Sequence, residues 1–278
     1  MISIQTNVDS LVAQSNMNVN QAAQSKTIQQ LTSGYRINSS ADDAAGLAIA
    51  NTYRDNIAQL NQGVRNANDG ISQLQIVDGG LSNISNILDR MQTLATQSAS
   101  DTFTGSRTVL DNEYQGLLKE IDRQASNINL SGALGGSATF NSKLSIYVGG
   151  GSSAANAAVT VDLSGATNLV DSSSLGLGGT SITTGNANAA IAAITTAISN
   201  LGNVQGVVGA GENKLNYAVG LANSQIANFS AAQSQIRDAD VAADAANLSK
   251  GQVLMQTSVA AMAQANQESQ SVLKLLQG

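Results

Sequence analysis

The sequence lacks several residue types altogether. Among 278 residues there is no cysteine, histidine, tryptophan or proline, and aromatic residues make up 3%. The absence of cysteine excludes disulfides, thiol catalysis and thiolate metal sites. The absence of proline removes the residue that most strongly breaks helices from within. Long uninterrupted helices are therefore favoured.

Charge is also scarce. Charged residues make up 12% of the chain and the formal net charge is −6, whereas about 25% is typical. No run of lysine or arginine exists, which excludes nucleic acid and anionic membrane surfaces as expected partners. A surface of amides, hydroxyls and alanine is typical of a protein that packs against copies of itself rather than of a lone soluble protein. The first residues lack the basic and apolar regions of a signal peptide, and no apolar run approaches the ~20 residues of a membrane span.

Apolar residues recur every seventh position in the first helical region, at Leu60, Ala67, Leu74, Leu81, Leu88 and Ala95. A second apolar position lies three residues before these in the first half (Ile57, Val64, Ile71) and three after in the second half (Val77, Ile84, Met91). This pattern predicts a long helix whose apolar stripe shifts around the axis near Gly79 and Gly80.

Two further helical regions follow the same logic. Residues 107–127 predict a shorter helix with Leu110, Tyr114, Leu117, Ile121 and Ile128 on one face. The C-terminal region repeats at seven from Ile194 through Leu201, Val208, Leu215, Ala222, Phe229 and Ile236, and a second series runs from Val241 to Leu276. Such spacing predicts long helices packed lengthwise, either as a coiled coil or as an ordinary bundle.

Residues 131–186 differ, because they are rich in glycine, serine and threonine. KLSIYV (143–148) and AVTVDL (158–163) each alternate apolar and polar residues between glycines, which predicts two short strands. The alternative interpretation is a flexible linker. The predicted fold is therefore mainly α, with long antiparallel helical rods, coiled-coil packing of both termini and a small β-hairpin region inserted in the middle.

The segment SGYRINSSADDAAGLAIAN (33–51) connects the first two predicted helices. Gly34 would end the first helix, and Ser40 would cap the second, with Asp43 in its first turn. Arg36 and Arg54 are the expected ion-pair partners of Asp42 and Asp43. Paired carboxylates for acid–base chemistry or metal binding are the less favoured interpretation, because no histidine or cysteine accompanies them.

Several of these motifs together resemble bacterial flagellin. They are LTSGYRINSSADDAAGLAIAN (31–51), GVRNANDGIS (63–72), LATQSAS (94–100), IRDADVAADAANLSKGQVL (236–254) and AQANQ (263–267). The resemblance covers about residues 1–130 and 200–278 and suggests a short form that lacks large outer domains. It implies a subunit of the extracellular flagellar filament, exported unfolded by the flagellar type III apparatus without a cleavable signal peptide.

The resemblance also implies a domain organisation. Residues 1–42 and 236–278 would form a terminal coiled-coil domain in the inner filament core, and 43–235 a rod domain that includes the tip at 131–186. We expect 1–33 to pair with about 240–276 of the same subunit, and neighbouring copies to bury what this pair leaves exposed. The predicted assembly core comprises Ile4, Val8, Leu11, Val19, Ile28, Leu31, Val241, Leu248, Met255, Val259, Met262, Leu273 and Leu276.

Partners follow from the resemblance too. They are an export chaperone that covers Val259, Met262 and the last helical turns, hook–filament junction and filament cap proteins, and a host Toll-like receptor that contacts Arg90, Leu94 and Glu113. A hook–filament junction protein is the alternative function, since it shares the terminal pattern. No cofactor or metal is expected. An enzyme is not expected either, since the middle region carries no HExxH helix and no nucleophile–base pair.

Overall fold

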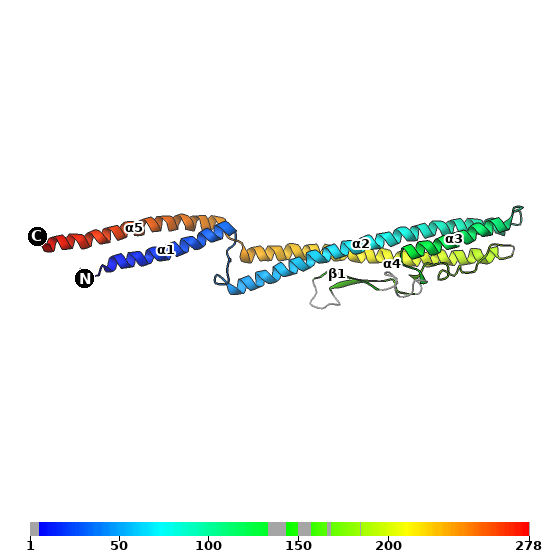
Figure 1. Cartoon of the computed structure of the whole chain (residues 1–278), viewed down its shortest axis with the longest axis horizontal. Coiled ribbons are helices and arrows are strands. Elements are labelled where there is room, and N and C mark those ends of the chain that lie inside the picture. Colours follow the sequence, from blue (N-terminus) through cyan, green and yellow to red (C-terminus); the bar gives the residue numbers. More distant parts are fainter. Residues whose placement is uncertain (1–5, 133–142, 150–156, 166–167, 184, 278) are drawn as a thin grey trace. The chain divides into compact units, whose positions relative to one another are not determined.

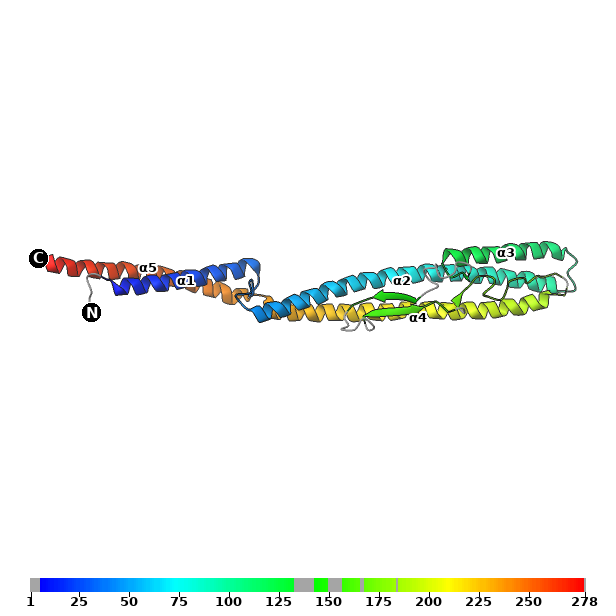
Figure 2. The ribbon, with the colours of Figure 1, turned by 60° about the horizontal axis from the view of Figure 1, so that its bottom comes forward.

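The fold was described from a computed structural model, which covers residues 6–132, 143–149, 157–165, 168–183 and 185–277, without the side chains of 269 and 272–277. Figures 1 and 2 show long helices and one small hairpin. The elements in order are α1 (Val8–Ser33), α2 (Ala44–Ala99), α3 (Arg107–Asn127), β1 (Lys143–Tyr147), β2 (Ala158–Asp162), α4 (Ala187–Arg237) and α5 (Val241–Gln277). The predicted fold class, mainly α with an inserted hairpin, is confirmed.

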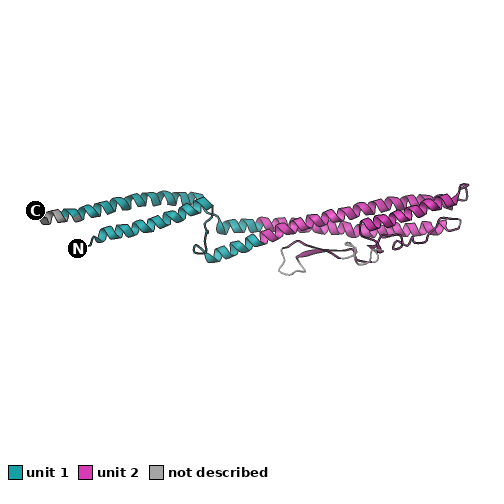
Figure 3. Cartoon of the chain, viewed as in Figure 1, with its two compact units in different colours: residues 1–55, 228–278 teal, residues 56–227 magenta. Residues whose placement is uncertain are grey.

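The chain forms two compact units (Figure 3). Unit 1 comprises Met1–Asp55 and Asn228–Gly278, and unit 2 comprises Asn56–Ala227. The predicted division fell at 42/43 and 235/236, close to the ends of helices. The structure instead divides within the continuous helices α2 and α4, because their outermost turns pack in unit 1, where the rings of Tyr53 and Phe229 stack 5.6 Å apart.

The core of unit 2 follows the predicted seven-residue repeat. All six positions from Leu60 to Ala95 in α2 are at most 1% exposed, as are Ile194, Leu201, Val208 and Leu215 of α4. The predicted shift of the α2 stripe is wrong. Gly63 and Gly70 occupy the buried positions that Val77, Ile84 and Met91 hold further along. The buried stripe of α2 therefore runs straight along the helix. In its first half two of the buried positions are glycines, which the apolar pattern did not count.

The hairpin explains those glycines. Strands β1 and β2 pair antiparallel with Ile146 opposite Val159, as the alternating segments predicted. A side chain at Gly63 would strike the backbone carbonyl of Val148, and one at Gly70 would strike Ile146. On α4, Gly211 lies against Val161 in the same way. Small residues on α2 and α4 thus let the hairpin approach both helices closely.

Helix α3 has the predicted bounds, and its buried face is Tyr114, Leu118, Ile121 and Ala125. Leu118 is buried rather than Leu117, which is half-buried. The Tyr114 hydroxyl and the Thr180 hydroxyl are 2.8 Å apart, and burial raises the pKa of Tyr114. Helix α3 is therefore fixed to the segment that precedes α4 by polar contacts as well as by apolar ones.

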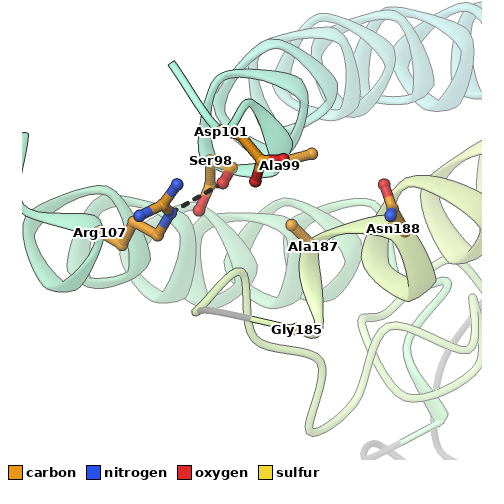
Figure 4. A pocket seen from close by; sticks show the side chains of 7 residues that line it. All are labelled: Ser98, Ala99, Asp101, Arg107, Gly185, Ala187 and Asn188. Carbon is orange, nitrogen blue, oxygen red and sulfur yellow. Dashed lines mark hydrogen bonds between the residues drawn. The ribbon is translucent and has the colours of Figure 1, made fainter. Parts of the chain in front are cut away.

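Arg107 closes the turn between α2 and α3. Its Nε donates to the carbonyl of Ser98 at 3.0 Å and its Nη2 to that of Ser100 at 2.9 Å. Carbonyls at a helix C-terminus have no intrahelical partner and favour a nearby cation. Figure 4 shows this arginine beside a small cavity that Asp101 and Asn188 also line. Arg107 thus has a structural role as the C-terminal cap of α2.

Helix α4 is apolar enough over one 18-residue window to meet the length and composition of a membrane span. The sequence carries no uninterrupted apolar run of that length. The same helix contributes ten buried residues to the structure, from Ala187 to Ala222. The apolar window itself is 28% buried, and a single helix of this kind is weak evidence for a membrane span.

Candidate assembly surface

The terminal helices α1 and α5 lie side by side and antiparallel in unit 1 (Figures 1 and 2). The Asn7 side-chain amide donates to the carbonyl of Ala265 at 2.9 Å. Nearer the other end of α1, Gln24 faces Gly251. The expected pairing of the two termini within one chain is therefore present.

The residues that face each other in this pair form two regular series, which we call the seam. They are partly covered and spaced alternately by three and four. On α1 they are Ser10, Ala13, Met17, Asn20, Gln24, Thr27 and Leu31, and on α5 they are Asp244, Leu248, Gly251, Met255, Ser258, Met262 and Ala265. Most are small or polar. No residue of α1 is buried, nor is any described side chain of α5.

Four apolar residues of α1 point away from α5, whereas Ala13, Met17 and Leu31 lie in the seam. Val8, Leu11, Val12 and Val19 are 57%, 54%, 55% and 65% exposed. At 3.6 residues per turn they share the side of α1 opposite the seam. We call these four residues the outward stripe. The predicted assembly-core residues among them, Val8, Leu11 and Val19, thus lie outside the contact with α5.

The predicted assembly-core residues therefore fall into three sets. Leu31, Leu248, Met255 and Met262 are partly covered in the seam. Val8, Leu11, Val19, Ile28, Val241 and Val259 are exposed. Ile4 and the side chains of Leu273 and Leu276 lie outside the described residues.

The connector between α1 and α2 contains an N-terminal cap for α2, as predicted, but a different residue forms it. Helix α1 ends at Gly34 in a left-handed conformation, φ 73°, as predicted. Helix α2 begins at Ala44, and the Asp43 carboxylate accepts a hydrogen bond from the Gly46 N–H at 2.9 Å. Asp43 is therefore the N-cap. Ser40 is not, because the helix starts later than the sequence suggested.

Asp42 organises the same connector. Its carboxylate accepts from the backbone N–H groups of Asn38 and Ser39 and pairs with Lys26 Nζ at 2.8 Å. The Lys26 hydrogen bond, ahead of those from the backbone, lowers the pKa of Asp42 to about 2. Lys26 is thus the ion-pair partner of Asp42, whereas the sequence predicted an arginine in that role.

Neither predicted arginine pairs with these acids. Among the ion pairs of the described residues, none joins Arg36 or Arg54 to Asp42 or Asp43. Arg36 Nη2 instead donates to the carbonyl of Ile236 at 2.6 Å. Neither this contact nor the stacking of Arg237 on Tyr35, with 4.1 Å from the guanidinium carbon to the ring centre, was predicted from the sequence. An arginine as the last residue of α4 was the signal available for it.

Of the three residues of the predicted receptor surface, two are exposed and one is buried. Arg90 donates from Nε and Nη2 to one oxygen of Glu113, at 3.0 and 2.7 Å, and both side chains are exposed. Leu94 is 1% exposed. Leu94 is therefore a core residue of unit 2 in this structure and not part of its surface.

The described residues were also compared with the donor sets that metal ions require. Within the described ranges there is no group of three or more histidine, cysteine, aspartate or glutamate side chains placed to hold a metal ion. The cavity of Figure 4 is lined by Asp101 and Arg107 as its charged residues, and Arg107 is occupied as a helix cap.

Long paired helices, a small hairpin docked on glycines and a terminal pair without a buried core define a helical class of protein suited to self-association. Family models agree with that class. The model described as "Bacterial flagellin N-terminal helical region" matches residues 4–137, and "Bacterial flagellin C-terminal helical region" matches 191–276. The chain belongs to the bacterial flagellin family.

The chain is also similar to individual flagellins. The chain is 41% identical over 180 residues to a flagellin of Escherichia coli K12, a match that covers 64% of this chain and 34% of the relative. It is 40% identical over 183 residues to a flagellin of Shigella flexneri, which covers 66% of this chain and 32% of the relative. The crystal structure of Bacillus cereus flagellin is 32% identical, with a TM-score of 0.47 over 61% of this chain and 94% of that one. The chain spans about a third of the length of the curated relatives it matches.

Proposed function

We propose that this flagellin is the structural subunit of an extracellular bacterial flagellar filament used for motility. The single observation that carries the proposal is the outward stripe of α1. Val8, Leu11 and Val12 lie within adjacent turns on one side of a helix whose other side already faces α5, and Val19 lies on the same side two turns further on, beyond the exposed Ser15 and Asn16. Several apolar residues gathered on one exposed side of a helix are typical of an interaction site, whereas single scattered ones are not.

The energetics of the α1–α5 pair support the same proposal. Ordering the backbone costs roughly 1–2 kcal/mol per residue. The seam residues of the pair are only partly covered, so their burial offsets only part of this cost. Burial of a valine or leucine contributes about 1.5–3 kcal/mol, and the four stripe residues have not yet made that contribution. Neighbouring copies supply it, so that folding of the pair and assembly are coupled.

The geometry of such a contact favours a filament. We propose that the stripe meets a surface of the neighbouring copy other than that copy's own stripe. Contacts between two different surfaces generate an open helical polymer when the rotation does not close a ring. The low charge of the chain, 12% of residues, limits repulsion between copies.

An assembly assay with single stripe variants tests the proposal. Replacing Val19 with asparagine removes the burial of one valine, so the concentration needed for polymer growth rises on the order of tenfold or more. Gln21→Asn is the matched control, because Gln21 is exposed on the same helix and is already polar. Sedimentation and electron microscopy measure the polymer, and circular dichroism of the free chain shows whether unit 2 stays folded. Normal filaments from Val8→Asn, Leu11→Asn and Val19→Asn alike would contradict the proposal.

We further propose that other proteins cover these surfaces before and after assembly. An export chaperone would mask α5 through exposed residues such as Val259, together with Met262 and the last turns, and so prevent premature polymerisation. The filament would end against junction and cap proteins. A host Toll-like receptor would contact the exposed Arg90–Glu113 pair. Co-purification of the chaperone with wild type but not with Val259→Asp tests the first of these contacts.

A further inference from the structure

Two connectors meet where α1 and α4 end. The Arg36 N–H donates to the carbonyl of Arg237 at 2.7 Å, and the Ala239 N–H donates to the carbonyl of Gly34 at 3.0 Å. Tyr35 and Asp238 form an isolated antiparallel bridge between these bonds. Residues 34–36 and 236–239, which we call the clasp, therefore hold the start of the α4–α5 connector against the end of α1.

Side chains reinforce the clasp from both strands. Arg36 places its guanidinium at the C-terminus of α4, where it donates to the carbonyl of Ile236 at 2.6 Å. This is where the helix dipole favours a cation. Arg237 stacks its guanidinium 4.1 Å from the centre of the Tyr35 ring. Each connector thus contributes one arginine that engages the other.

The seam between α1 and α5 repeats too regularly to define its own register. On α5 the larger seam residues are Leu248, Met255 and Met262, and the smaller ones are Gly251, Ser258 and Ala265, each spaced by seven. A slip of one heptad places Met255 where Met262 was and Ser258 where Ala265 was. At these positions side chains of similar size then meet the same partners, whereas Asp244 takes the place of Gly251 opposite Gln24. Because no described seam side chain is buried, the slipped pairing loses little burial.

Residues of α1 break this degeneracy only weakly, because Met17, Gln24 and Leu31 differ in polarity but none of them is buried. Its smaller seam residues Ala13, Asn20 and Thr27 are also spaced by seven, and none is buried. One polar contact stands at the far end, where the Asn7 amide reaches the carbonyl of Ala265. A partly exposed hydrogen bond of this kind discriminates weakly, because water satisfies the same groups in a slipped pairing.

We infer that the clasp sets the register of α1 against α5. Helix α1 ends at Ser33, directly before the clasp, and α5 begins at Val241, two residues after it. A slip of one heptad displaces a helix by about 10 Å along its axis. Such a displacement is incompatible with the two backbone hydrogen bonds of the clasp, so the paired connectors exclude the slipped alternatives.

A heptad deletion separates control by the clasp from control by the far end. Deletion of residues 252–258 from α5 keeps the seam spacing, since Met262 takes the place of Met255. Spin labels at Ser25 and Ser249 report the clasp side, and labels at Gln14 and Ala260 report the far side. All four side chains are exposed, and the chain has no native cysteine to interfere. Distances are measured in an osmolyte concentration at which the full-length chain reaches its maximal helix content.

The two possible controls give opposite results. If the clasp sets the register, the Ser25–Ser249 distance is unchanged by the deletion. The Gln14 and Ala260 labels become offset by about 10 Å along the axis, and Gln21 becomes level with Ala260. If the Gln14–Ala260 distance is kept and the Ser25–Ser249 pair is offset instead, the inference is overturned. The inference is also overturned if either pair of labels in the undeleted chain shows more than one distance, because the register would then not be fixed.

Substitution of the arginines is the complementary test. Arg36→Gln with Arg237→Gln adds a second Ser25–Ser249 population in the undeleted chain, offset by about one heptad. Arg54→Gln is the control, because it removes one arginine charge from unit 1 outside the clasp. A single unchanged distance in the double variant, with fast amide exchange at Arg36 and Ala239 showing that the clasp is open, would also overturn the inference.

Discussion

Gly63 of α2 lies directly against the backbone carbonyl of Val148, the residue that follows β1. The two are 85 positions apart in the chain, and no side chain separates them. Asn66, one turn along α2, donates from its side-chain amide to the Tyr147 carbonyl at 3.1 Å. The backbone approach and this side-chain hydrogen bond thus both hold the hairpin to α2.

The substitution Gly63→Ala is therefore expected to destabilise unit 2 by about 1–3 kcal/mol, because a methyl group would strike a backbone carbonyl that cannot move aside without shifting the hairpin. Gly79→Ala is the matched control in the same helix. No atom lies within 4 Å of a side chain added there, so alanine stabilises the helix by up to about 1 kcal/mol. Urea unfolding of the two variants measures both effects. Equal changes in the two variants would contradict the close approach.

These glycines show what the sequence pattern could and could not predict. The seven-residue repeat of α2, the bounds of α3 and both strands followed from periodicity alone, because each reflects which face of an element is buried. The straight buried stripe of α2 did not, since Gly63 and Gly70 are counted as gaps in an apolar stripe. A glycine is recognisable as a buried contact only when the element packed on it is known, and here that element is about 80 residues away.

The terminal helices were less predictable for a different reason. Apolar periodicity reports which residues are buried in the end, and it does not say by which chain. Val8, Leu11 and Val19 were predicted as part of the assembly core without a named partner, and the side of α1 that faces α5 carries Asn20, Gln24 and Thr27 as well as Met17 and Leu31. Under the proposed function, the exposed apolar side of α1 is left to neighbouring copies.

Helix α3 provides a test of pH dependence. Arg123 donates to both carboxylate oxygens of Glu120, with Nε 2.8 Å from Oε2, and Gln124 donates as well. The Arg123 hydrogen bonds, followed by that of Gln124, lower the pKa of Glu120 from 4.5 to about 2. A carboxylate with a depressed pKa in the folded state stabilises that state above its unfolded pKa. This contribution is complete above about pH 4.5 and is lost as the pH falls towards about 2.

An NMR titration of the Glu120 carboxyl carbon is expected to show a midpoint near 2 in wild type and a clearly higher one in Arg123→Gln. Lys119→Gln removes an adjacent charge that makes none of these hydrogen bonds, and it should leave the midpoint near the wild-type value. A wild-type midpoint near 4.5 would show that the Arg123–Glu120 pair is not formed in solution.

Substitutions in the predicted receptor surface can distinguish a residue that stabilises the core from residues that act at the surface. Leu94 is 1% exposed, so Leu94→Ala is expected to lower the free energy of unfolding by about 2–5 kcal/mol. Arg90 and Glu113 form an exposed pair, and alanine at either position should cost about 1 kcal/mol or less. Val109→Ala, at a residue 64% exposed on α3, is a control expected to stay within about 0.5 kcal/mol.

Receptor signalling measured on the same variants then distinguishes contact from folding. With the proposed receptor contact, Arg90→Ala and Glu113→Ala reduce signalling at nearly unchanged stability, because they remove exposed charges that a partner can reach. Leu94→Ala reduces signalling in proportion to the fraction of chain that unfolds, and a temperature at which this variant is fully folded restores it. If signalling by Leu94→Ala stays low in the fully folded state, Leu94 reaches the receptor directly. The buried position would then have to open on binding.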